Sequence, residues 1–166
     1  MLGNIPPLRA LIAEGEGLHL DFKQTISSAK KIAKTVCAFA NTQGGKLLIG
    51  VKDNGRIVGC EVNEELYMVE SAARLYCRPA VTFQRTVHEE KEKWVLEVDI
   101  PQSPNRPHQA QDEDGKWLAY VRVEDQTQLA SRVVLDLLKH QVREQPSLIE
   151  FTETESQLMA ALRTQA

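Results

Sequence analysis

The stretch AFANTQGGKLLIGV at positions 38–51 constrains the fold more than any other part of the chain. Small apolar residues lead into Asn41 and Thr42, two glycines follow at positions 44 and 45, and a burst of leucine and isoleucine comes next. Glycine often ends a helix because it adopts left-handed backbone conformations without a steric penalty. We therefore expect a helix that stops near Asn41, a glycine turn, and a strand at residues 46–51 that is buried on both faces.

The residues before this stretch predict the helix itself. Ser27 and Ser28 offer an N-cap. Apolar residues then recur at spacings of three and four, which is the stripe of an amphipathic helix over residues 29–40: Ala29, Ile32, Ala33, Val36, Cys37 and Ala40. Three lysines fall outside that stripe and are expected on the solvent face.

The rest of the chain alternates between strand and helix patterns. Beyond the elements above, we expect helices at residues 6–15, 62–76, 127–142 and 152–163, and strands at residues 18–23, 56–60, 81–87, 93–100 and 117–123. The Asn54-Gly55 pair predicts a type I′ turn before residues 56–60. This order predicts an α+β fold in which a mixed β-sheet is covered by helices. Gln145-Pro146 divides a domain at residues 1–145 from a helical tail at residues 146–166.

Composition narrows the class of protein. The chain has 166 residues, of which 42% are hydrophobic and 26% charged, as in a globular domain. No run of about 18 apolar residues occurs, so we expect no membrane span. The three cysteines form no CxxC pair, and the N-terminus lacks a secretory pattern. We therefore expect reduced thiols in a cytoplasmic protein.

The two glycines do not form a phosphate loop of the Walker type. That loop follows a strand and opens a helix with the pattern GxxxxGK[ST]. Here the order is reversed, because the helix comes first and the strand follows. The glycines are therefore interpreted as a helix end and a tight turn, and no ATP site is evident.

Three acids are candidates for a metal site. Glu16 and Asp21 flank the start of the strand at residues 18–23, and Asp53 follows the strand at residues 46–51. If these two strands are neighbours, the three carboxylates converge, and such a set can hold Mg²⁺ or Mn²⁺ for phosphodiester cleavage. The alternative is that Glu16 is an ordinary loop acid and Asp53 a turn former.

Basic residues cluster in the first third of the chain. Residues 1–60 carry eight Lys/Arg and four Asp/Glu, a net charge of +4, whereas residues 61–166 carry twelve and nineteen, a net charge of −7. Lys30 and Lys34 are one helical turn apart, and Lys31 lies beside them. Such a stripe binds phosphate backbones, although a plain solvated helix face explains it equally well.

The combined motifs resemble the AlbA-type domain of the Schlafen family. The resemblance rests on EGEGLHLDFK, the lysine-bearing helix, AFANTQGGKLLIGVKDNGRIVGC, VDIPQSPNRPH and WLAYVRVEDQTQLAS, and it covers roughly residues 10–135. It implies a compact α+β nucleic-acid-binding fold. In vertebrate Schlafens two such lobes form a clamp that cleaves tRNA and rRNA with three acids.

Carried onto this chain, the resemblance implies catalytic and metal-binding roles for Glu16, Asp21 and Asp53. The expected phosphate-binding face consists of basic residues of the chain: Lys23, Lys30, Lys31, Lys34, Lys52, Arg106 and Arg122. Two departures from the family pattern stand out. Asp21 occupies a position where the family usually has glutamate, and Lys52 occupies one where vertebrate members have an acid.

Three functions remain open at this stage. The first is a nucleic-acid-binding module that acts on DNA or RNA through its basic face. The second is a metal-dependent endoribonuclease, and the third is a protein-interaction or oligomerisation domain. Because the family clamp uses two lobes and this chain carries one, a homodimer is also expected.

Overall fold

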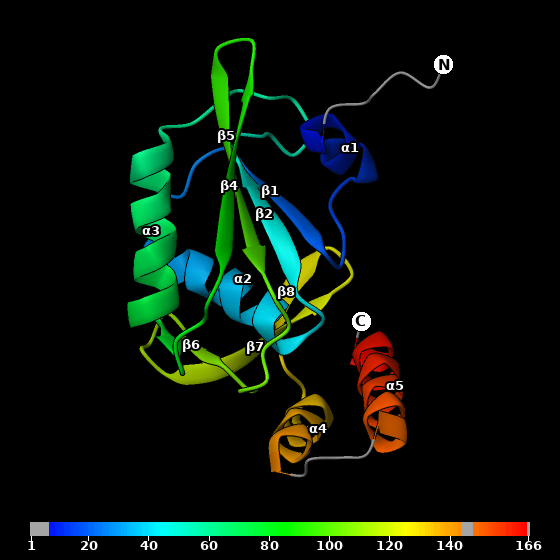
Figure 1. Ribbon diagram of the computed structural model, residues 1–166. Coiled ribbons are helices and arrows are strands. Elements are labelled where there is room, and N and C mark those ends of the chain that lie inside the picture. The colour runs from blue at the N-terminus through cyan, green and yellow to red at the C-terminus, as the bar shows by residue number, and fades with distance from the viewer. Residues whose placement is uncertain (1–6, 144–147, 166) are drawn as a thin grey trace, which may run out of the picture.

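The fold combines two four-stranded β-sheets with five helices (Figure 1). The computed structural model describes residues 7–143 and 148–165. The helices are α1 (Pro7–Glu14), α2 (Ala29–Asn41), α3 (Val62–Leu75), α4 (Arg132–Arg143) and α5 (Leu148–Gln165). The strands are β1 (Leu20–Lys23), β2 (Gly45–Ile49), β3 (Cys77–Arg78), β4 (Gln84–Glu90), β5 (Lys93–Ile100), β6 (Gln109–Gln111), β7 (Trp117–Val123) and β8 (Gln126–Leu129). The predicted α+β class is confirmed.

The first sheet has the strand order β1-β2-β5-β4. Strands β1 and β2 are parallel, with Phe22 opposite Leu48, and α2 is the crossover helix between them. Strands β2, β5 and β4 pair antiparallel. Helices α2 and α3 pack on one face through a large apolar cluster, and α1 covers part of the other face through Leu8. Leu48 is completely buried in that second cluster, as expected for a strand covered on both sides.

The two glycines turn the chain from α2 into β2 in a space that chain atoms fill. Gly44 has a φ of +76°, and a Cβ there would lie 2.8 Å from the carbonyl oxygen of Ile100 and 2.9 Å from the amide nitrogen of Gln102. A Cβ on Gly45 would overlap the ring of Phe39. The glycines are therefore required for close packing, in agreement with their interpretation as a turn.

The second sheet has the strand order β3-β6-β7-β8, and its pairs are antiparallel. Asn41, at the end of α2, joins this sheet to the helix. Its amide nitrogen donates to the carbonyl oxygens of His108 (2.9 Å) and Tyr120 (2.8 Å), and its amide oxygen accepts from the N–H of His108 (2.7 Å). The Thr42 hydroxyl accepts from the N–H of Arg122 (2.9 Å). The Asn-Thr pair of the opening stretch thus connects the two sheets.

Three predictions about local structure are wrong. Residues 56–60 form no strand beside β2, because β1 and β5 already occupy both of its edges; an isolated bridge, Val51 to Ile57, is what remains. The turn before them is not type I′, because Asn54 does not have the positive φ that this turn requires. Residues 126–129 form β8 rather than helix, and α4 begins after Ser131, whose hydroxyl accepts from the N–H of Val134 at 3.2 Å.

Helix α5 packs against the rest of the fold. A third apolar cluster joins it to α4 and β7, and it contains Val121, Val123, Val134, Leu138, Leu158 and Leu162. The expected domain boundary at residues 145 and 146 lies outside the described residues. The side chains of three apolar residues in the expected tail, Leu148, Ile149 and Phe151, also lie outside what the structure describes. No helix in the described part of the chain is long and apolar enough to cross a membrane.

Candidate functional site

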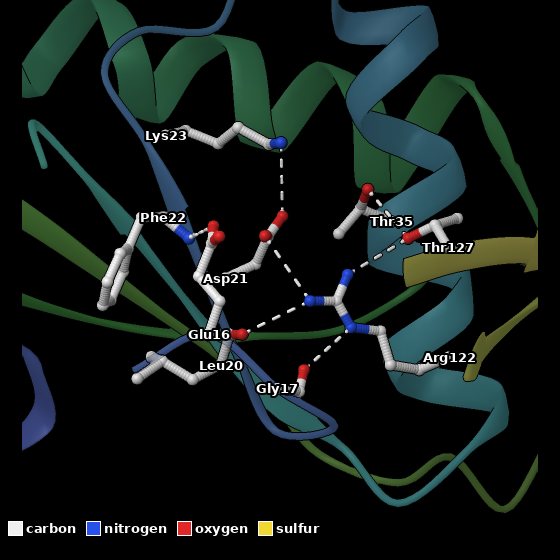
Figure 2. A network of polar contacts seen from close by, with 9 residues as sticks. All are labelled: Glu16, Gly17, Leu20, Asp21, Phe22, Lys23, Thr35, Arg122 and Thr127. Carbon is white, nitrogen blue, oxygen red and sulfur yellow. Dashed lines mark hydrogen bonds and ion pairs between the residues drawn. The ribbon is translucent and has the colours of Figure 1, made fainter. Parts of the chain in front are cut away.

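A network of polar contacts lies where β7 meets the edge of β1 (Figure 2). Arg122 extends from β7 and is only 2% exposed. Its Nη2 lies 3.4 Å from Oδ1 of Asp21. Its Nε donates to the carbonyl oxygen of Gly17 (3.0 Å), and its Nη2 donates to that of Leu20 (3.3 Å). Arg122 therefore caps the free edge of β1 and neutralises the acid beside it.

Two acids are brought together at this point. One carboxylate oxygen of Glu16 accepts from the N–H of Phe22 at 2.9 Å. Burial raises the pKa of Glu16, and its contact with Asp21 and the charge of Asp53 raise it further, against the opposing effect of the Phe22 N–H. Glu16 and Asp21 thus behave as a close acid pair next to a buried cation.

The third predicted acid does not complete a metal site in this arrangement. Asp53 is exposed in the turn after β2, whereas Asp21 is 6% exposed and paired with Arg122. Within the described residues, no group of three His, Cys, Asp or Glu side chains is placed to hold a metal ion. The Mg²⁺ or Mn²⁺ site therefore stays a prediction, and a buried guanidinium already balances the charge of its second carboxylate.

A pocket adjoins this network at the start of α2. Its volume is about 220 Å³, and it is lined by Lys23, Thr25, Ile26, Ser27, Ser28, Lys31, Ile32 and Thr35. Lys23 links the pocket to the network, because its Nζ lies 3.3 Å from Oδ2 of Asp21 while 39% of its side chain remains exposed. Thr35 provides a second link, since its hydroxyl accepts from that of Thr127 at 3.2 Å.

The lining of this pocket suits an anion. Two lysines and four residues with hydroxyl groups are among its lining residues, and no Asp or Glu is among them. Ser28 caps α2 by accepting from the N–H of Lys31 (3.2 Å), so the positive end of the helix dipole is also directed at this place. Glu65 lies behind Thr25 and accepts from its hydroxyl and from the N–H of Ile26.

The remaining predicted lysines lie apart from the pocket. Lys30 is half-buried on α2 and Lys52 lies in the turn after β2. Lys34 donates to a carboxylate oxygen of Glu113 (2.8 Å), an ion pair that raises the pKa of the lysine. Of the three lysines on α2, Lys31 is the one that lines the pocket.

Two predicted phosphate contacts are corrected by their burial. Arg122 is enclosed as described above. Arg106 is 5% exposed, and its Nη2 donates to a carboxylate oxygen of Glu155 on α5 at 3.0 Å. Neither guanidinium reaches the surface, so both have structural roles here. Their carboxylate partners, Asp21 and Glu155, are distant in the chain and carry no signal in the local sequence.

Sequence reasoning missed the hydroxyl groups of the pocket. Ser28 was identified as a cap, but Thr25, Thr35 and Thr127 were not identified as part of a site. Thr35 lies on the stripe side of α2 and is buried. A threonine among apolar residues on a helix face is the signal that could have marked it, because a buried hydroxyl requires a hydrogen-bond partner.

Comparison with solved structures supports the fold. The DIP2311 protein from Corynebacterium diphtheriae matches with a TM-score of 0.55 and 20% identity, over 76% of this chain and 26% of that one. The N-terminal domain of a RecG-related protein from Nitrosomonas europaea matches with a TM-score of 0.56 and 22% identity, over 71% of this chain and 88% of that domain. The matched region is thus about a quarter of the first protein.

Comparison of the sequence itself gives the family. No curated protein matches the chain significantly. The family model described as "Schlafen, AlbA_2" matches residues 16–131, which is 116 of the 166 residues and includes the acid pair, the pocket and Arg122. The resemblance seen in the sequence is confirmed, and the chain belongs to the Schlafen AlbA_2 family.

Proposed function

We propose that this chain is a nucleic-acid-binding module that holds a backbone phosphate in the pocket at the start of α2. The observation that carries the proposal is the lining of that pocket, which includes Lys23, Lys31 and four residues with hydroxyl groups but no Asp or Glu. The family membership supports it, because the Schlafen AlbA_2 region spans the whole pocket.

The network behind the pocket has a positioning role in this proposal. Arg122 fixes Asp21, and Asp21 in turn holds the ammonium group of Lys23 at 3.3 Å. A lysine held by a salt bridge loses less side-chain entropy when it binds a phosphate than a freely rotating one does.

Recognition in this proposal is through the backbone rather than the bases. Lysine and hydroxyl groups contact phosphate oxygens, and such contacts carry no sequence information directly. The RecG-related relative bears a name that connects it with a DNA helicase. Because phosphate is common to both polymers, duplex DNA and tRNA are both suitable probes.

Loss of the two pocket lysines is expected to weaken binding. For the Lys23→Ala/Lys31→Ala variant, affinity for labelled duplex DNA or tRNA, measured by fluorescence anisotropy, should fall at least about tenfold. One hydrogen bond to a charged group contributes roughly 1.5–3 kcal/mol, and about 1.4 kcal/mol corresponds to a factor of ten.

The matched control is Lys139→Ala, which removes an exposed lysine of α4 that does not line the pocket. It should bind like the wild-type chain. Equal loss in the control and the double variant would show that general surface charge, rather than the pocket, binds the polymer. Full affinity in the double variant would remove the basis of the proposal.

A metal-dependent ribonuclease is the second function that the family resemblance suggests. The arrangement of Glu16, Asp21 and Asp53 described above does not favour it over simple binding. Incubating the same tRNA with and without Mn²⁺ in the binding experiment would reveal any cleavage.

A further inference from the structure

Strand β4 is the open edge of the first sheet. It pairs with β5 on one side, and within residues 7–143 and 148–165 the sheet order places no strand on its other side. The hairpin that it forms with β5 projects beyond the rest of the fold (Figure 1). An edge strand of this kind offers unpaired backbone groups to another strand.

The direction of the backbone groups on β4 follows from the hairpin. Its turn consists of Lys91 and Glu92, both with positive φ (50° and 64°), so Glu90 and Lys93 close it as a hydrogen-bonded pair. Hydrogen-bonded and non-hydrogen-bonded pairs then alternate along the strands. The N–H and C=O groups of Arg85, Val87 and Glu89 therefore point away from β5. Trp94 lies opposite Glu89 in the hairpin. Its carbonyl oxygen accepts from the N–H of Cys60 (2.8 Å) rather than from β4, which confirms that Glu89 and Trp94 are a non-hydrogen-bonded pair.

These outward groups have no hydrogen-bond partner within residues 7–143 and 148–165. The surface beside this edge also carries exposed apolar side chains among its charged ones. Val87 is 44% exposed, and Trp94, diagonally adjacent on the same face, is 47% exposed. An exposed valine and tryptophan beside an unpaired strand edge indicate a surface that another strand covers.

The sequence of β4, QRTVHEE, is complementary to itself when reversed about its central residue. With Val87 opposite the partner's Val87, Arg85 lies opposite the partner's Glu89, and Glu89 lies opposite the partner's Arg85. All three positions are those whose backbone groups point outward, so each pair can exchange two hydrogen bonds. Opposite charges directly across such a pair stabilise it, whereas like charges destabilise it.

We propose that β4 pairs antiparallel with β4 of a second copy of this chain, about a two-fold axis that passes between the two Val87 residues. The two first sheets then form one continuous sheet. A foreign peptide would need its own complementary charges, whereas the second copy has them by symmetry.

A groove beside β4 accommodates the rest of the partner's hairpin. Beyond Glu89, the partner's turn would run alongside residues 81–84. A groove of about 680 Å³ lies there, and it is lined by Glu70, Ala73, Arg74, Val81, Thr82, Phe83, Gln84 and Arg85. The turn region at residues 89–92 carries three glutamates and one lysine. Glu90 is paired with Arg9 of its own chain, so Glu89 and Glu92 are the acids that would meet Arg74 and Arg85 in this groove.

The pairing leaves the proposed phosphate pocket open. Strand β1, next to that pocket, is at the opposite edge of the sheet from β4. A dimer through β4 would therefore carry its two pockets at the two ends of the joined sheet. The inference does not depend on what the pocket binds.

The test uses the full chain without nucleic acid in sedimentation-velocity centrifugation at micromolar concentrations. The wild type is expected to dimerise. Arg85→Glu and Glu89→Arg should each weaken the dimer at least tenfold, because each places two like-charge pairs across the axis. The double variant Arg85→Glu/Glu89→Arg restores the opposite-charge pairs and should dimerise as the wild type does. The control Arg132→Glu, on exposed α4, should change nothing.

A second variant tests the backbone pairing. Val87→Pro removes an N–H that β5 does not use, so the hairpin should survive while the dimer is lost. A wild type that stays monomeric at the highest concentration would overturn the proposal. So would a double charge reversal that fails to restore the dimer, or a Val87→Pro variant that retains it. Dimerisation abolished by removal of α5 but unaffected by the single charge reversals would equally overturn it.

Discussion

The Arg122→Met variant is expected to lose about 3–5 kcal/mol of the free energy of unfolding, the usual cost of removing one partner from a buried ion pair. Methionine matches much of the volume of the arginine but leaves Asp21 without its buried cation, so that only the partly exposed Lys23 remains paired with it. It also removes the donor groups that satisfy the carbonyl oxygens of Gly17 and Leu20. Urea unfolding followed by circular dichroism measures the change.

A second substitution separates the charge effect from lost packing. In Arg122→Met/Asp21→Asn no buried charge is left unpaired, so part of the lost stability should return. The exposed arginine Arg56 gives the matched control, since Arg56→Met should change stability by no more than about 0.5 kcal/mol. A single variant as stable as the wild type would mean that Arg122 does not hold β1 in the way described.

The Gly44→Ala variant is expected to lose roughly 2–5 kcal/mol of the free energy of unfolding. A left-handed backbone costs an L-residue about 1–2 kcal/mol, and forcing an extra group into a filled space costs about 1–3 kcal/mol. The atoms that the new methyl group would meet, the carbonyl oxygen of Ile100 and the amide nitrogen of Gln102, belong to the backbone. They cannot rotate away as a side chain would.

Gly115 provides the matched control for this prediction. Its φ is +83°, close to the +76° of Gly44, but a Cβ there would have no atom within 4 Å. Gly115→Ala should therefore show the cost of the backbone conformation alone. The difference between the two variants in thermal or urea unfolding gives the cost of the close approach. Equal losses in both would show that the space beside Gly44 can adapt.

Local sequence patterns were sufficient to predict the elements around the opening stretch. Ser28 capped α2, the apolar stripe gave its buried side, and the glycines marked its end. The strand at residues 93–100 was predicted with its correct bounds, whereas its partner was predicted at residues 81–87 and runs from Gln84 to Glu90, because the connection is a two-residue turn. These features depend on neighbours within a few positions, which is the range at which periodicity and turn chemistry operate.

Features that depend on distant partners could not be predicted. Arg122 looked like a surface cation, but its partner Asp21 is 101 positions earlier in the chain. Residues 126–129 looked helical, yet pairing with β7 makes them a strand. Residues 56–60 looked like a strand, but β5, more than 30 residues further on, occupies the place beside β2. In each case tertiary contacts outweighed local preference.

The residues of the candidate site also divide into those that local sequence predicted and those that depend on distant contacts. Lys31 was recognised from its place off the apolar stripe, and Lys23 from the family pattern. The pocket that joins them requires the end of β1 to lie beside the start of α2, and it includes hydroxyl groups with no motif of their own. Burial, which the sequence did not reveal, distinguishes these lysines from Arg106 and Arg122.

The most direct test of the account is the salt dependence of nucleic-acid binding in the wild-type chain and in Lys23→Ala/Lys31→Ala. Each lost phosphate contact flattens the slope of log affinity against log salt concentration by about 0.7–0.9. If both lysines contact phosphate, the double variant should have a slope flatter by roughly 1.4–1.8. An unchanged slope in that variant, or a wild-type chain that binds neither duplex DNA nor tRNA at low salt, would contradict the account.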